Sequence, residues 1–126
     1  MTITAFQSPV PGAWPFGKIT VLNAGTPVAI NVNIGTQTAN ATTHPTPAVK
    51  QLIFFAGPEN TDLVYILRNT AGASRLTTNF VVAIVAPGQT VPLPNGSLGI
   101  TSFNPDDYVV DADANGNWVL VTGITG

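Results

Sequence analysis

Four of the six acidic residues fall within eight positions near the C-terminus: Asp106, Asp107, Asp111 and Asp113. The segment that runs from Asp111 to Gly116 (DADANG) places oxygen donors at its first, third and fifth positions and glycine at its sixth, as a calcium loop does at its start. The twelfth position is Thr122 and not the bidentate glutamate of such a loop. We therefore favour a plain acidic hairpin that faces water, and we expect no metal.

The other reactive residue types show no catalytic spacing. His44 is the only histidine, the chain has no cysteine, and no carboxylate is near His44 in sequence, so an exposed loop residue is favoured over a zinc ligand. None of the serines stands in a Gly-x-Ser-x-Gly elbow, and no pair of carboxylates is marked for glycoside hydrolysis. The sequence therefore predicts no catalytic residue, no cofactor and no enzyme. Sugar binding remains an alternative, because four aromatic residues could offer stacking faces: Trp14, Tyr65, Tyr108 and Trp118.

Composition excludes several kinds of partner. Charged residues make up 8% of the 126 residues, against a usual share of about 25%. Four basic residues cannot neutralise a run of phosphates, so nucleic-acid binding is excluded. The longest unbroken apolar run, residues 80–86, is far shorter than the roughly 20 residues that span a bilayer, so no membrane partner is expected.

The elements that must position these residues are predicted to be strands. Helix-favouring Glu, Lys, Arg and Met are scarce, and short β-branched runs alternate with Gly, Pro and Asn. We predict an all-β fold, a single antiparallel β-sandwich. Residues 17–23 and 28–34 are predicted to form a first hairpin, and Asn115-Gly116 is predicted to close a last hairpin between residues 108–114 and 117–123. Residues 49–56 and 63–67 should be central strands, residues 80–86 the most buried strand, and the proline-rich residues 91–94 an edge.

The first 16 residues carry three prolines and no sustained apolar period, so we interpret them as an extended arm preceding a sandwich domain at residues 17–126. Two roles are open for the aromatic residues of this arm: they complete the core of their own domain, or they anchor a partner. In the second role the partner-binding residues are Phe6, Trp14 and Phe16. The polar loops at residues 35–47 and 68–79 are further candidate contact surfaces.

Several segments, taken in order, resemble a family of small structural proteins from tailed bacteriophage virions. They are GKITV at 17–21 leading to GTPV at 25–28, NTDLVYI at 60–66, APGQTVPL at 86–93, NPDDYVVDA at 104–112 and VLV at 119–121. The resemblance implies a jelly-roll-like sandwich that decorates or cements a capsid, with the neck or tail as another position. It also implies the major capsid protein as partner and a virion location after assembly in the host cytoplasm. We expect a homo-oligomer, with a trimer as the favoured order.

Overall fold

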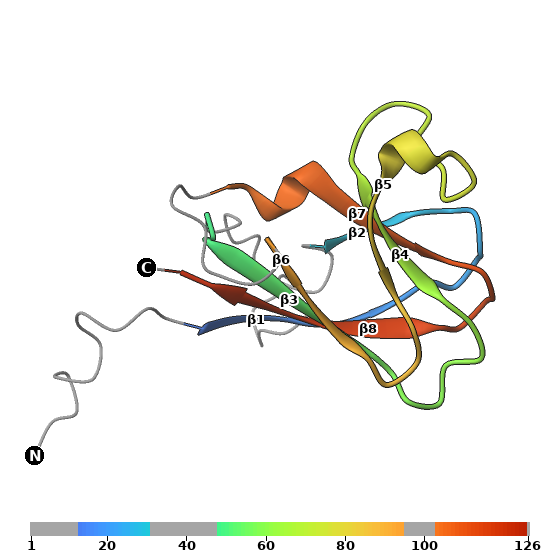
Figure 1. The fold of residues 1–126 in the computed structure, drawn as a ribbon, viewed down its shortest axis with the longest axis horizontal. Coiled ribbons are helices and arrows are strands. Elements are labelled where there is room, and N and C mark those ends of the chain that lie inside the picture. The colour runs from blue at the N-terminus through green and yellow to red at the C-terminus, as the bar shows by residue number, and fades with distance from the viewer. Residues whose placement is uncertain (1–12, 31–47, 95–102, 126) are drawn as a thin grey trace, which may run out of the picture.

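The computed structural model describes residues 13–30, 48–94 and 103–125, which form two antiparallel four-stranded sheets (Figure 1). Sheet A has the order β1 (Ala13–Thr20), β8 (Trp118–Ile124), β3 (Gln51–Ala56) and β6 (Thr90–Leu93). Sheet B has the order β2 (Val28–Ala29), β7 (Tyr108–Ala112), β4 (Val64–Arg68) and β5 (Val81–Val85). The prediction of an all-β sandwich is confirmed.

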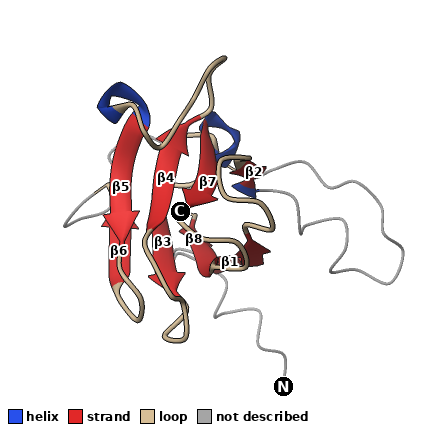
Figure 2. Cartoon of the chain, turned by 90° about the vertical axis from the view of Figure 1, so that its right-hand side faces the viewer, coloured by secondary structure: helices blue, strands red, loops and turns tan. Residues whose placement is uncertain are grey.

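The strand order is that of a jelly roll. The first strand pairs with the last, β2 pairs with β7, β3 pairs with β6, and β4 pairs with β5. The chain is thus an antiparallel ribbon, doubled back at the β4–β5 connection and then rolled so that successive strand pairs alternate between the two sheets. Figure 2 shows the two sheets that result, with sheet B in the upper part of the view and sheet A in the lower part.

The core lies between the sheets, and in β3 and β8 it is filled by alternate residues. In β3 the even-numbered side chains are buried, and in β8 the odd-numbered ones are, as the period of two requires. The largest buried side chains are aromatic and aliphatic: Phe16, Ile19, Leu52, Phe54 and Ile66. The residues on the opposite face of β3 and β8 are half-buried or exposed.

Both predicted hairpins are wrong, for the same reason. The described parts of residues 17–23 and 28–34 lie in β1 and β2, which belong to different sheets, and residues 31–34 lie outside the described residues. β7 and β8 are likewise separated. Asn115 and Gly116 do form a turn, and Gly116 has the positive φ of 86° that was expected. The turn joins two sheets, however, and it is tied to the first connection by the Gly116 amide, which donates to the Val21 carbonyl at 2.7 Å.

Sheet position confirms three further predicted strands and corrects a fourth. β3 and β4 are central strands, and the proline-containing β6 is an edge, as predicted. β5 is not the most buried strand, because it is the edge of sheet B and leaves Ile84 48% exposed. A seven-residue apolar run therefore marked an edge strand with one face outward, a distinction that its composition does not reveal.

Candidate interaction surface

Of the three predicted anchor residues, the structure describes the side chain of Phe16 only. Phe6 lies outside the described residues. Trp14 belongs to β1, in register with Gly123 of β8. Phe16 is fully buried, because a register shift between Pro15 and Gly17 turns its ring into the core. Its role as a partner anchor is therefore wrong, and it takes the other role, that of completing its own core.

The same strand corrects the boundary of the arm. β1 begins at Ala13, so residues 13–16 are part of sheet A and the sandwich starts before the expected Gly17. Of the two polar loops, residues 35–47 lie outside the described residues. Residues 68–79 are described as the end of β4, a turn and the start of the 3-10 helix η3 (Thr78–Phe80).

The outward face of sheet A carries a set of apolar side chains from three strands. Its side chains alternate with the buried residues of β3 and β8, and cross-strand pairs join them into rows. Leu120 lies opposite Phe55, and Ile53 lies opposite Pro92. All are half-buried except Leu120, which is 42% exposed. We call this set the sheet A apolar face: Ile53, Phe55, Pro92, Trp118, Leu120 and Ile124.

Trp118 is the largest member of this face and is held on several sides. Its indole Nε1 donates a 2.8 Å hydrogen bond to a Glu59 carboxylate oxygen, and its ring meets that of Phe55 edge-on at 6.4 Å. The Lys18 ammonium lies 4.8 Å from the indole centroid, a cation–π geometry. Gly57 lies directly beneath the ring, since a Cβ there would be 2.3 Å from Cε2. The indole is thus fixed in place before any partner binds.

Asn60 connects this face to the β3–β4 turn. Its side-chain amide donates to the Trp118 carbonyl at 2.8 Å, and its amide oxygen accepts from the Trp118 backbone N–H at 3.0 Å. A buried asparagine therefore satisfies both backbone groups of the first residue of β8, as a neighbouring strand would do. Nothing in the spacing of Asn60 in the sequence indicates this role.

The acidic segment is organised differently from the expected water-facing hairpin. Asp111 is 1% exposed and accepts hydrogen bonds from the backbone N–H groups of Gly25 and Ala112. Arg75, from the β4–β5 connection, lies 3.6 Å from Asp111 and 2.9 Å from Asp113. The expectation that these acids face water is wrong for Asp111, because a guanidinium from a distant loop compensates its charge.

Tyr65 belongs to the same network. Its hydroxyl donates a 2.9 Å hydrogen bond to Asp113. Burial raises the pKa of Tyr65 above its ordinary value of 10.0, and the hydrogen bond to Asp113 raises it further. The hydrogen bond to Asp113 likewise raises the pKa of Arg75. The side chains of this network bind one another, so the positive charge of Arg75 is compensated by Asp111 and Asp113 within the chain.

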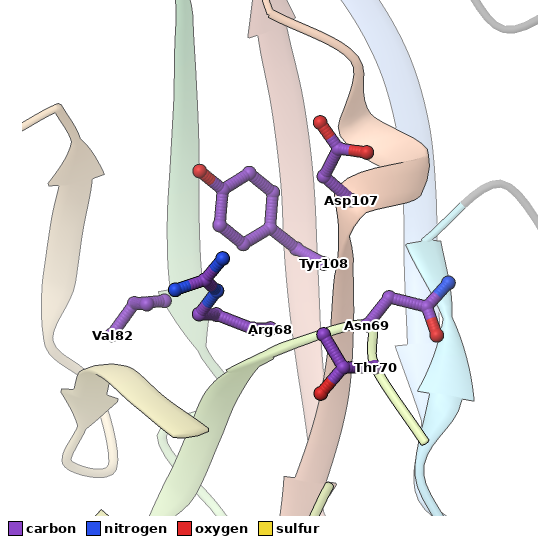
Figure 3. A pocket seen from close by; sticks show the side chains of 6 residues that line it. All are labelled: Arg68, Asn69, Thr70, Val82, Asp107 and Tyr108. Atoms are coloured by element: carbon purple, nitrogen blue, oxygen red, sulfur yellow. The ribbon is translucent and has the colours of Figure 1, made fainter. Parts of the chain in front are cut away.

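Tyr108, one of the predicted stacking residues, lines a pocket. The pocket has a volume of about 490 Å³ and lies where β4 ends, β7 begins and β5 starts (Figure 3).

Among residues 13–30, 48–94 and 103–125, no group of three or more His, Cys, Asp or Glu side chains could hold a metal ion. Nor does any described helix have the length and apolar character needed to cross a membrane. His44 lies outside the described residues.

Comparisons with known proteins add no relative, because no family model, no curated protein and no solved structure matches this chain.

Proposed function

We propose that this protein is a structural protein of a tailed bacteriophage virion, which binds the outer surface of the capsid as a decoration or cement protein. The single observation that carries the proposal is the sheet A apolar face. A protein that acts by attachment needs a preformed surface of low charge, and this face supplies one on a rigid sheet. The order of sequence segments that resembles the virion family supports the same function.

The physical argument concerns desolvation. Complete burial of a large apolar side chain contributes about 1.5–3 kcal/mol, so several half-buried members can contribute a few kcal/mol together. A charged face would have to desolvate ions, which often costs more than the ion pairs return. Lys18 and Glu59 already interact with Trp118, so both charges have partners within the chain. The face can therefore be covered with little electrostatic penalty.

The major capsid protein is the proposed partner, and the proposed mode of action is attachment without catalysis. Many copies on one shell contact equivalent sites, so a modest affinity for each copy is sufficient, and a homo-oligomer multiplies it. We retain the trimer as the proposed order, and Phe6 and Trp14 as predicted contacts additional to the apolar face.

Heating of bare and decorated particles tests the proposal. Capsids lacking this protein are incubated with the purified chain, washed, and heated in the presence of a DNA-binding dye that reports genome release. We expect release at a higher temperature after incubation with the wild-type chain. Equal release temperatures, together with absence of the chain from the washed particles, would contradict the proposed function.

A further inference from the structure

The pocket beside Tyr108 is built from three parts of the chain that are distant in sequence. Its lining consists of Arg68, Asn69, Thr70, Val82, Asp107 and Tyr108. Arg68 ends β4, Asp107 ends the 3-10 helix η4 (Pro105–Asp107), and Val82 lies in β5 at a register shift that leaves it without a partner on β4. Such a bulge redirects a side chain, here towards the pocket. In the view of Figure 3, the Arg68 guanidinium lies between the Tyr108 ring and the Val82 side chain.

The loop around the pocket is held by backbone hydrogen bonds, so its shape does not depend on a ligand. The Asn69 amide donates to the Asp107 carbonyl at 2.8 Å, and the Asn69 side chain donates to the Asp106 carbonyl at 2.9 Å. The Tyr108 ring meets the Phe103 ring edge-on at 5.8 Å, with an interplanar angle of 85°. The aromatic wall of the pocket is therefore fixed in orientation.

The polar groups that remain at the pocket are complementary in type. Neither the Arg68 guanidinium nor the Asp107 carboxylate has a hydrogen bond or ion pair with another residue of the described ranges, and the two do not pair with each other. A guanidinium only donates hydrogen bonds and an ionised carboxylate only accepts them. A ligand that satisfies both must donate as well as accept hydrogen bonds.

We propose that this pocket binds a saccharide, with one sugar ring lying against Tyr108 and its hydroxyls bonded to Arg68 and Asp107. Adjacent hydroxyls donate and accept, and the C–H face of a sugar ring packs on an aromatic ring. A simple anion would be repelled by Asp107, and a simple cation by Arg68. The pocket volume is within the range of about 300–1,000 Å³ that is usual for small-molecule sites. This binding is independent of the proposed attachment to capsids, because the pocket lies outside the sheet A apolar face.

Titration of the isotope-labelled full chain, followed by NMR, tests the proposal. The probes are the methyl glycosides of glucose, galactose, mannose and N-acetylglucosamine, with inorganic phosphate and glycine as competing chemistries. At the ligand efficiency usual for small molecules, a monosaccharide should bind with a Kd of about 1–10 mM. We expect saturable shifts with at least one glycoside.

Two pocket variants and one matched control localise the binding. Asp107→Asn and Arg68→Gln should each weaken glycoside binding by about tenfold or more, since hydrogen bonds to charged groups are the stronger ones. Asp62→Asn makes the same charge change before the opposite end of β4 and keeps the oxygen that accepts from the Leu63 amide, so it should bind as the wild type does. Three outcomes would overturn the proposal. They are the absence of a saturable shift with any glycoside, glycoside binding by both pocket variants that equals that of the wild type, and saturable shifts with phosphate or glycine only.

Discussion

Gly57→Ala should disturb the indole that dominates the sheet A apolar face. The added Cβ would lie 2.3, 2.5 and 2.7 Å from Cε2, Cζ2 and Nε1 of Trp118, all distances that real Cβ contacts do not show. A rigid ring cannot yield at one atom, so either the whole indole moves or the backbone does. Moving the indole weakens its 2.8 Å hydrogen bond to Glu59, and moving the backbone strains the 3.2 Å bond from the Gly57 amide to the Trp118 carbonyl.

The expected cost follows from these contacts. Overpacking of a filled site typically costs about 1–3 kcal/mol, whereas replacement of an unstrained glycine by alanine stabilises by about 0.4–1 kcal/mol through the unfolded chain. Gly57 is not among the glycines with positive φ, so both contributions apply to it. The net expectation is a loss of about 1–2 kcal/mol of unfolding free energy. Urea denaturation followed by circular dichroism measures it.

A double-mutant cycle gives this prediction its control. In a Trp118→Ala background the clash is absent, so Gly57→Ala should be neutral or slightly stabilising there. Gly72→Ala is the matched control for backbone strain, since Gly72 has φ of 79° and nothing within 4 Å of an added Cβ. If Gly57→Ala is as stable as the wild type, or destabilises equally with and without the indole, the packing of Trp118 on Gly57 is refuted.

Three further predictions concern the hydrogen bonds of Asn60 to Trp118 and the interactions of Arg75 and Tyr65 with the acidic segment. Asn60→Ala should cost about 1–3 kcal/mol in urea denaturation, because it leaves the Trp118 backbone N–H without its partner and removes one of the two donors to the Trp118 carbonyl, and an unchanged midpoint would contradict this role. Arg75→Met should cost about 2–4 kcal/mol by the same measurement, since buried Asp111 loses its compensating charge, and retained wild-type stability would show that backbone donors suffice. The raised pKa of Tyr65 means that the folded state favours the protonated hydroxyl, so this contribution is present below the ordinary value of 10.0 and is lost as pH rises through the folded pKa. Wild type should therefore lose more thermal stability between about pH 9 and 11 than Tyr65→Phe, and parallel curves would contradict the hydrogen bond to Asp113.

The sequence predicts the strands better than it predicts their partners. Alternation along a strand reports which side chains are buried, and β3, β4 and β6 occupy the central and edge positions that their composition indicates. Pairing is a different property, since a turn such as Asn115-Gly116 supplies positive φ equally well within a hairpin or between two sheets. In a rolled ribbon most connections pass from one sheet to the other. The residues of a single turn do not indicate whether it joins strands of the same sheet or of different sheets.

The candidate surfaces could be predicted only in part. Tyr108 and Trp118 were identified as aromatic residues of interest, but the sequence left two roles open for Phe16, and only the structure shows that it completes the core. The contact of Arg75 with Asp111 joins residues 36 positions apart through a loop without periodicity, so no local pattern indicates it. The sheet A apolar face likewise depends on which faces of β3 and β8 lie together, and only the register of the sheet establishes this.

The most direct test of the central claim is co-sedimentation of the purified chain with bare capsids, comparing two charge substitutions. Leu120→Glu places a carboxylate in the sheet A apolar face at a residue that is 42% exposed, and Ile84→Glu does the same on the edge strand β5 of sheet B at a residue that is 48% exposed. The account predicts that Leu120→Glu weakens binding at least about tenfold, because a carboxylate must be desolvated when the face is covered, whereas Ile84→Glu binds as the wild type does. Equal binding by Leu120→Glu and the wild type, or a loss confined to Ile84→Glu, would contradict it.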